Sequence, residues 1–372
     1  MSVAAPQKDL LDPAALDDDL GSVERPSRHR LLTPRSLRRA SIVLGAYVAA
    51  LAVYFVVVAI RGADPFAVFG TMVQSTLFNW SALQQVILRA VPLVLAALAV
   101  SVPARAGMVN VGGEGQLIMG AVAACGVGIA VGASWPGPLS WLAMAVAGAA
   151  AGGLWAGIAG FMRSVLGANE AVSTLLLNFV ANDVMLFLIY QPWKYAKGSG
   201  QPESAPLAGV ARLPDIFGSE LDIGVLVVVA VAVGVWWLLR RSNWGFCLRV
   251  VGGNREAARR AGLPVKRLLV SSMIVGGLLA GLGGMLNFAG LEHQLRPGIS
   301  AGFGYIAFLA AFLGRHDPPK VVAAALLFAA IEVSGNGIQL GYGLDGSITD
   351  ILLGLIVVAP LVLSRRLRGV TG

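Results

Sequence analysis

Residues 82–102 read ALQQVILRAVPLVLAALAVSV, and this stretch decides the class of fold. It carries one charged side chain, Arg89, in a run long enough to cross a bilayer, since about 20 helical residues span the ~30 Å hydrocarbon core. Similar stretches recur along the chain, so we predict an all-α, multi-pass membrane protein with about ten transmembrane helices and a lower bound of eight. The predicted spans lie near residues 40–60, 82–102, 116–134, 140–162, 170–190, 221–240, 268–290, 300–314, 320–338 and 346–363.

The composition supports a membrane protein and excludes several other classes. Hydrophobic residues make up 56% of the 372 residues and charged residues only 13%, about half of the ~25% found in soluble domains. Cys125 lies in an apolar stretch and Cys247 in a basic loop, so we expect no disulfide between them. The net charge of +8 is spread over the connections rather than gathered in a groove, so we expect no binding of nucleic acid.

The positive charges predict the orientation. With the N-terminus inside, the cytoplasmic connections carry 22 of the 28 Lys and Arg residues and the external ones carry five. Cytoplasmic loops of membrane proteins are enriched in Lys and Arg. We therefore place both termini in the cytoplasm, with residues 1–39 as a disordered tail and 40–365 as the membrane domain. The connection 241–267 is then cytoplasmic, and the connection 191–220 is external.

A glycine-rich stretch, PARAGMVNVGGEGQLIMG at residues 103–120, interrupts the pattern of regular spans. Irregular backbone at membrane depth is tolerated only where it is buried in protein or lines a water-filled cavity. One interpretation is a broken or re-entrant element whose Asn110, Glu114 and Gln116 lie beside a solute pathway. The other is an ordinary cytoplasmic turn in which Glu114 caps the helix that follows.

The predicted span at 170–190 carries a polar stripe. Glu170, Thr174, Asn178 and Asn182 are four residues apart, and with 3.6 residues per turn each step drifts by only roughly 40°. Such side chains are costly when they face lipid. They either line a solute pathway, together with the adjacent Asn169 and Ser173, or form a polar contact between helices.

The connection 241–267 predicts a short capped helix. Asn254 is a favourable N-cap, Glu256 lies in the first turn, and Gly262 with Pro264 ends the helix. A loop that only sets topology explains the arginines, whereas a helix that docks a partner explains the cap as well. The predicted docking residues are Gly253, Asn254, Arg255, Glu256, Ala257, Ala258 and Gly262.

Several kinds of chemistry have no signature in the sequence. The nucleotide-binding pattern Gly-x4-Gly-Lys-Ser/Thr does not occur, and the three histidines show no metal-ligand spacing. We therefore predict a protein that is not an enzyme, with no catalytic residue, no metal site and no cofactor of its own.

The motifs together resemble a known family. Met108–Gln116 is similar to the Asn-Ile-Gly-x-Glu-Gly-Gln motif of permease subunits of bacterial ABC importers in the ribose, simple-sugar and branched-chain amino-acid superfamily. Asn169–Asn178 resembles the Asn-Glu-x-x-Ser-Thr-Leu-x-x-Asn segment of its nucleoside-type members. Gly253–Gly262 is similar to the family's cytoplasmic Gly-x-Asn-x-x-Ala-Ala-x-x-x-Gly loop, and Leu313–Pro318 to its Leu-Gly-Arg-x-x-Pro block.

The resemblance implies the following function and partners. The chain would be a permease subunit in a bacterial cell membrane that imports a nucleoside or a related small polar solute by alternating access. It would act with a cytoplasmic ABC ATPase that uses the ATP, a second permease subunit, identical or not, and an extracellular solute-binding lipoprotein. The alternative from another class is a self-sufficient secondary transporter or facilitator.

Overall fold

The computed structural model describes residues 34–197, 200–216 and 218–368, and the regular structure in these ranges is helical apart from one isolated bridge between Asp215 and Asp222. The predicted tail 1–39 lies mostly outside the described residues. The α-helices are α2 (Pro34–Ile60), α3 (Pro65–Leu77), α4 (Trp80–Ala104), α5 (Gly113–Val131), α6 (Gly137–Phe161), α7 (Glu170–Tyr190), α8 (Gly224–Arg241), α9 (Asn243–Gly253), α10 (Arg255–Arg260), α11 (Val265–Leu286), α12 (Phe303–Leu313), α13 (Pro318–Tyr342) and α14 (Ser347–Arg368). The π-helical turns η1 (Met162–Leu166) and η3 (Asn287–Glu292) extend α6 and α11, and η2 (Gly209–Ala211) is a 3₁₀ turn.

The all-α class is confirmed, and the seven or eight candidate spans among the described residues lie at or just below the lower bound of the expectation. Seven described helices are long and apolar enough to cross a membrane, namely α4, α5, α6 with η1, α7, α8, α11 with η3, and α13. An eighth is counted if α2 and α3, which are bent by 110°, form one span. The predicted span 300–314 instead contains the 11-residue α12, which is only about 16 Å long at 1.5 Å per residue.

Helix α3 lies in the connection 61–81 between the first two predicted spans, where no helix was predicted. The Asp64 carboxylate caps its start by accepting the Phe66 N–H at 2.9 Å, and Pro65 occupies the first helical position, where its missing N–H costs nothing. At 13 residues α3 is too short to span the core alone, which is why a search for apolar runs of 20 residues misses it.

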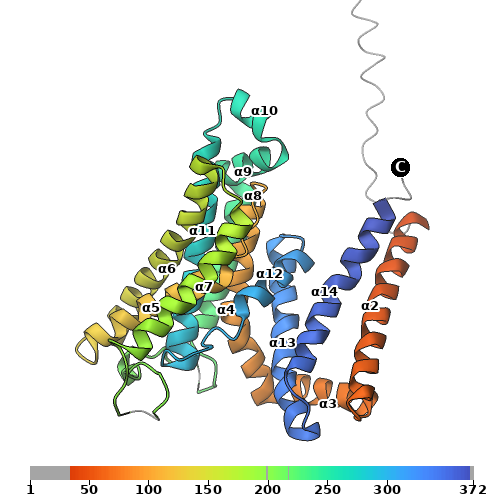
Figure 1. Cartoon of the computed structure of the whole chain (residues 1–372), viewed down its shortest axis with the longest axis horizontal. Coiled ribbons are helices and arrows are strands. Elements are labelled where there is room, and N and C mark those ends of the chain that lie inside the picture. The colour runs from red at the N-terminus through yellow and green to blue at the C-terminus, as the bar shows by residue number, and fades with distance from the viewer. Residues whose placement is uncertain (1–33, 198–199, 217, 369–372) are drawn as a thin grey trace, which may run out of the picture.

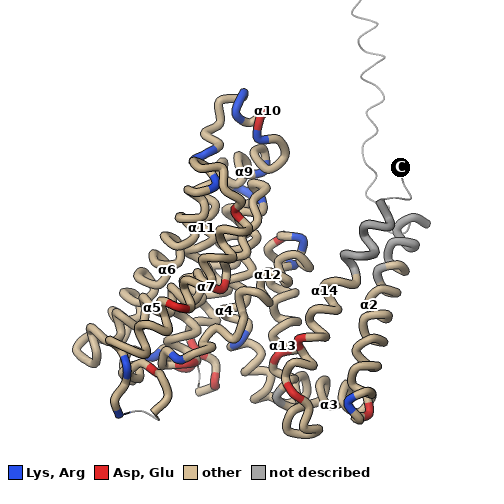
Figure 2. Tube along the Cα trace, viewed as in Figure 1, with Lys and Arg blue, Asp and Glu red and all other residues tan. Residues whose placement is uncertain are grey.

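The helix ends sort onto two sides of the molecule. In Figure 1, α9 and α10 form one end, and the start of α2 and the end of α14 point to the same side. The turns between α5 and α6 and between α7 and α8 lie at the opposite end, as does α3. Figure 2 shows a concentration of Lys and Arg around α9 and α10. This arrangement agrees with the predicted topology, while the assignment of the α10 side to the cytoplasm stays a prediction.

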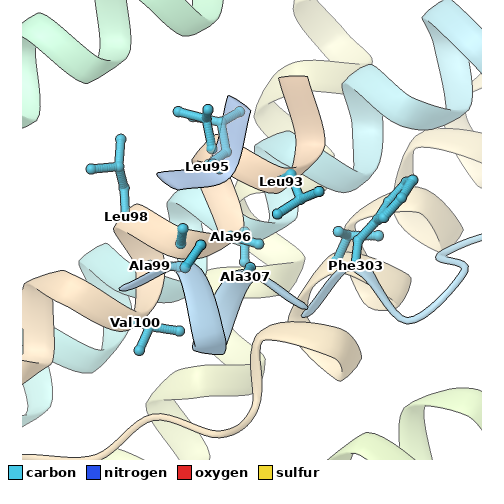
Figure 3. Close-up of a cluster of buried hydrophobic side chains, with 14 of the residues drawn as sticks. Leu93, Leu95, Ala96, Leu98, Ala99, Val100, Phe303 and Ala307 are labelled. Carbon is cyan, nitrogen blue, oxygen red and sulfur yellow. The ribbon is translucent and has the colours of Figure 1, made fainter. Parts of the chain in front are cut away.

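Helix α4 is the centre of the bundle. In the most apolar 18-residue stretch of α4, 89% of the residues are buried. The helix packs against α8, α11, α12 and α13. Figure 3 shows the cluster in which leucine and alanine side chains of α4, among them Leu93 and Ala96, lie beside Phe303 and Ala307 of the short helix α12. The core therefore fixes the first turn of α12 inside the protein.

Glycines bring α5, α6 and α11 into backbone contact. A Cβ atom on Gly281 of α11 would lie 2.2 Å from the carbonyl oxygen of Gly148 in α6, and one on Gly284 would lie 1.9 Å from that of Leu117 in α5. Small residues let membrane helices approach closely. Close packing matters there because lipid, unlike water, does not drive apolar helices together. This three-helix unit holds the start of α5, where the polar site begins.

Candidate functional site

The glycine-rich stretch connects two complete helices, each long and apolar enough to cross a membrane, so it does not interrupt a single span. Helix α4 ends at Ala104, α5 begins at Gly113, and the backbone between them is irregular. The fully buried Asn110 exchanges two hydrogen bonds with Gln116, one of 3.1 Å from Asn110 Nδ2 to Gln116 Oε1 and one of 2.9 Å from Gln116 Nε2 to Asn110 Oδ1. Asn110 Oδ1 also accepts the N–H of Gly112 at 3.0 Å. These amides supply hydrogen-bond partners where the backbone before α5 is not helical.

The polar stripe of α7 fastens this loop from the other side. Thr174 Oγ1 accepts the N–H of Val111 at 3.1 Å. Asn178 Nδ2 donates to the carbonyl of Val111 at 2.9 Å, and Asn178 Oδ1 accepts the N–H of Gly115 at 2.8 Å. Both side chains are almost completely buried, with exposed fractions of 1% and 2%. The observed geometry is a polar contact between elements, which is one of the two alternatives that the spacing left open.

Glu114 joins the starts of two helices. It lies in the first turn of α5, where its Oε2 accepts the N–H of Gly304 in α12 at 2.6 Å and its Oε1 accepts the Ser300 hydroxyl. The N-cap of α12 is Gly302, which has no side chain to cap with. Helix N-termini carry partial positive charge and favour a nearby carboxylate. Glu114 is therefore a cap, but for α12 rather than for its own helix as the sequence suggested.

The remaining predicted pathway residues lie in two other places. At the start of α7, Asn169 is the exposed N-cap and accepts the N–H of Ala171 at 3.0 Å, Ser173 donates to the Asn169 carbonyl at 3.0 Å, and Glu170 pairs with Arg163 at 3.1 Å. Asn182 is half-buried one turn beyond Asn178. The structure thus joins Asn110, Glu114, Gln116, Thr174 and Asn178 around one loop and separates the other four. A role in lining the pathway stays a prediction for all nine.

The predicted docking helix is present as α10. Asn254 Oδ1 accepts the N–H groups of Glu256 and Ala257, both at 3.0 Å, which confirms the N-cap. Glu256 in turn pairs with Arg259 at 2.9 Å and with Arg260 at 3.2 Å. Gly262, with φ of 79°, follows the helix in the left-handed conformation that favours glycine. Figure 1 shows α10 projecting from the end of the bundle.

The two faces of α10 differ in exposure. Ala258 is completely buried against this chain, whereas Ala257 and the preceding Gly253 are exposed. The Arg255 guanidinium donates to the carbonyl of Gly107 at 2.8 Å, and a Cβ atom on Gly252 would lie 2.2 Å from the carbonyl oxygen of Arg105. The α9–α10 segment is therefore in direct contact with the glycine-rich loop. This contact could not be predicted from sequence patterns, because it joins residues about 150 positions apart.

A charged cluster lies beside this contact. Asp317 pairs with Arg240 at 3.0 Å and faces Arg105 at 4.0 Å, while Arg105 donates to the His316 carbonyl at 2.8 Å. Burial, and then the charge of Arg105, lower the pKa of His316 below its ordinary value, which favours the neutral imidazole near pH 7. The cluster ties the α12–α13 turn to the ends of α4 and α8.

One further ion pair joins two spans. Arg89 of α4 and Glu332 of α13 are 2.7 Å apart, and their side chains are 29% and 17% exposed. Both residues stand far from the ends of their helices. An unpaired charge is expensive at that depth in a membrane. Both charges are visible in the sequence, but their pairing could not be predicted because the two residues are 243 positions apart.

Comparison with known proteins shows which family the sequence matches. Residues 82–361 match the family model described as the permease component of the branched-chain amino acid transport system. The glucose ABC transporter permease protein TsgB13 of Haloferax volcanii is 36% identical over 325 residues, which cover 83% of this chain and 84% of that protein. The guanosine ABC transporter permease protein NupP of Bacillus subtilis is 30% identical and covers 72% of this chain and 77% of its own length. The nucleoside ABC transporter permease protein NupB of Lactococcus lactis is 27% identical, with coverages of 66% and 70%.

The matched region contains the glycine-rich loop, the polar stripe, α10 and the Asp317 cluster, so the whole site described above belongs to the part that is shared with the family. The family's members are transport subunits rather than enzymes. The chain belongs to the family of permease components of ABC transporters.

Proposed function

We propose that this chain builds, with a second permease subunit, the membrane pathway of an ABC importer for nucleosides. The observation that carries the proposal is the direct contact between the superfamily motif at Met108–Gln116 and the segment Asn169–Asn178, which resembles nucleoside-type permeases. Gly115, in the Glu-Gly-Gln segment, donates to Asn178, in the Asn-Glu-x-x-Ser-Thr-Leu-x-x-Asn segment, at 2.8 Å. The two motifs are bonded to each other in the folded protein, so we read them together as one motif pair. Relatives named as guanosine and nucleoside permeases support the same solute class.

A sugar is the second candidate solute. A specific observation favours it, since the relative that is 36% identical over 83% of this chain is named a glucose permease. Sugars and nucleosides are both neutral and both carry several hydroxyl groups on a ring. A pathway that offers hydrogen-bond partners to one class can offer them to the other, so the membrane subunit alone separates the two classes poorly.

The proposal includes a route from ATP hydrolysis to the pathway. The partner ATPase docks on the exposed side of α10, with Gly253, Ala257 and Gly262 at the contact and Asn254, Arg255, Glu256 and Ala258 holding the helix in place. A shift of α10 pulls on the loop 105–112 through the bond from Arg255 to Gly107. That loop is bonded to α7 through Thr174 and Asn178, and Glu114 at the start of α5 holds α12. The network thus connects the docking site on α10 to α7, α5 and α12.

The same proposal fixes the orientation. The side of the bundle that carries α10 faces the cytoplasm together with both termini, and the ATPase binds there. The 191–220 connection faces outward, where the solute-binding lipoprotein delivers its solute. In the rival function, a secondary transporter, solute moves without an ATPase. Dependence on ATP separates the two.

Solute binding by the transporter's solute-binding lipoprotein tests the solute class. We expect isothermal titration with guanosine, adenosine and glucose to give a saturable heat for the nucleosides and none for glucose. Uptake of labelled guanosine by cells that express the complete transporter should then be competed by adenosine and not by glucose. Binding and uptake of glucose alone would replace the first candidate with the second, and binding of neither class would overturn both.

A further inference from the structure

Three charged side chains of the described candidate spans stand at least seven residues from both ends of their helices. They are Arg89 in α4, Asp183 in α7 and Glu332 in α13. Arg89 and Glu332 form an ion pair with each other. Asp183 lies instead on the exposed surface of the chain. Two of the three charges therefore have a protein partner, and the third points away from the bundle.

The depth of Asp183 makes its exposure expensive in lipid. Seven residues separate it from the end of α7 at Tyr190, which places it about 10 Å below that end at 1.5 Å per residue. Its Cα–Cβ bond tilts toward the helix N-terminus, farther from the nearer end, and the side chain is too short to reach the interface. A charged Asp at membrane depth is costly when it faces lipid, which is why such residues usually face protein or a water-filled cavity.

Asp183 stands in the middle of one face of α7. We call Val172, Leu176, Phe179, Asp183 and Phe187 the outer face of α7; the four apolar members are 53–63% exposed. At 100° per residue these positions fall within roughly 40° of Asp183. The opposite face holds Thr174, Asn178, Ala181, Met185 and Ile189, all buried against the bundle. α7 uses that inner side to pack against α5, α6 and η1.

The exposed faces of neighbouring spans provide a contrast. On α8 the exposed side chains Leu226, Val229, Val233 and Trp237 are all apolar, as are Leu142, Val146 and Leu154 on α6. Such faces suit contact with lipid. The outer face of α7 has the same apolar character except for a carboxylate at depth, which hydrocarbon does not solvate.

We propose that the outer face of α7 borders a water-filled path shared with the second permease subunit, and that Asp183 is hydrated there. The inference rests on the two-permease assembly proposed above and locates its path on the side of α7 opposite to Thr174 and Asn178. The carboxylate offers acceptor oxygens to the hydroxyl groups that sugars and nucleosides share. The buried network then acts as the support that holds this wall in position.

Thiol reactivity in the complete transporter tests the proposal. Native Cys125 and Cys247 are replaced by alanine, and single cysteines are introduced as Asp183→Cys and Leu176→Cys on the outer face of α7. Val229→Cys on α8 is the matched control, because it is exposed and stands about 8 Å from the corresponding helix end. Each variant is assembled with its partner subunits in membranes and treated with a small charged methanethiosulfonate reagent.

The reagent attacks the thiolate, whose fraction falls tenfold for each unit by which an apolar surrounding raises the thiol pKa. With a rise of about two units in lipid, Asp183→Cys and Leu176→Cys should react about 100-fold faster than Val229→Cys in at least one nucleotide state. Quenching of a fluorophore at each position by brominated lipid should show the reverse order.

Two results would overturn the proposal. Slow reaction at position 183 with strong quenching by brominated lipid would mean that the face contacts lipid. Slow reaction with no quenching in every nucleotide state would mean a dry contact with another subunit. Neither measurement depends on which solute is carried, so a failed nucleoside-binding experiment and a failed accessibility experiment remain distinguishable.

Discussion

Replacing Glu114 with leucine should separate the starts of α5 and α12. The substitution removes the acceptor of the Gly304 N–H and of the Ser300 hydroxyl and keeps a side chain of similar size in the buried site. A buried donor without a partner costs about 1–3 kcal/mol, so the two donors together predict a loss of about 2–6 kcal/mol in the free energy of unfolding. The lost attraction between the carboxylate and a helix N-terminus adds roughly 0.3–1 kcal/mol.

Two further variants divide this cost into its parts. Glu114→Gln keeps an oxygen for Gly304, and its amide donates to Ser300, so its stability should lie within about 1 kcal/mol of the natural protein. Ser300→Ala removes one donor of the buried Glu114 carboxylate and should cost about 1–3 kcal/mol. The predicted order of stability is therefore natural protein and Glu114→Gln, then Ser300→Ala, then Glu114→Leu.

Unfolding of the purified permease by dodecyl sulfate in mixed micelles, followed by circular dichroism, measures these differences, and uptake by the assembled transporter reports their effect on transport. Uptake should survive in Glu114→Gln and be lost in Glu114→Leu. A Glu114→Leu variant as stable and as active as Glu114→Gln would refute the role of the carboxylate as the cap of α12.

Three other substitutions test separate contacts. Glu332→Ala leaves Arg89 without its counter-charge and should destabilise the protein by about 3–5 kcal/mol in the same unfolding assay, while the double variant with Arg89→Met should recover most of the loss. Gly284→Ala places a Cβ atom 1.9 Å from the Leu117 carbonyl oxygen and should cost at least ~1–3 kcal/mol, whereas Gly354→Ala, which meets no atom within 4 Å, should be tolerated. Ala257→Trp on the exposed side of α10 should leave membrane insertion normal and abolish stimulation of the partner ATPase by the loaded binding protein; normal stimulation would place the ATPase contact elsewhere.

The local signals in the sequence predicted the local structure well. The cap of α10 at Asn254 follows from residues close together in the chain, and it is present. The charge and hydropathy patterns gave the all-α class for the same reason, since a span of 20 apolar residues needs no distant partner to be identified.

The sequence predicted distant contacts poorly. The stripe at Thr174 and Asn178 showed that one face of α7 is polar, but whether that face meets solute or protein depends on the loop at Val111 and Gly115, more than 60 residues away. Periodicity alone cannot separate the two cases, because buried backbone and water both satisfy polar side chains. A cap was one of two interpretations of Glu114, but the helix that it caps, α12, lies 190 residues further along the chain.

The prediction of a span at residues 300–314 was wrong for a related reason. Residues 300–314 are apolar enough to resemble a span, but α12 starts only at Phe303, inside the protein, where Glu114 supplies the missing cap. Apolar composition records burial and does not say whether lipid or protein surrounds the helix.

The most direct test of the central claim is ATP-driven uptake by the reconstituted assembly. The permease, its second permease subunit and the partner ATPase are placed in liposomes, with the binding protein and labelled guanosine on the side opposite to α10 and ATP on the α10 side. The account predicts accumulation above the supplied concentration with ATP, and no uptake when ATP is replaced by a non-hydrolysable analogue. Equilibration of guanosine across the membrane by the permease subunits without ATP or the ATPase would contradict it.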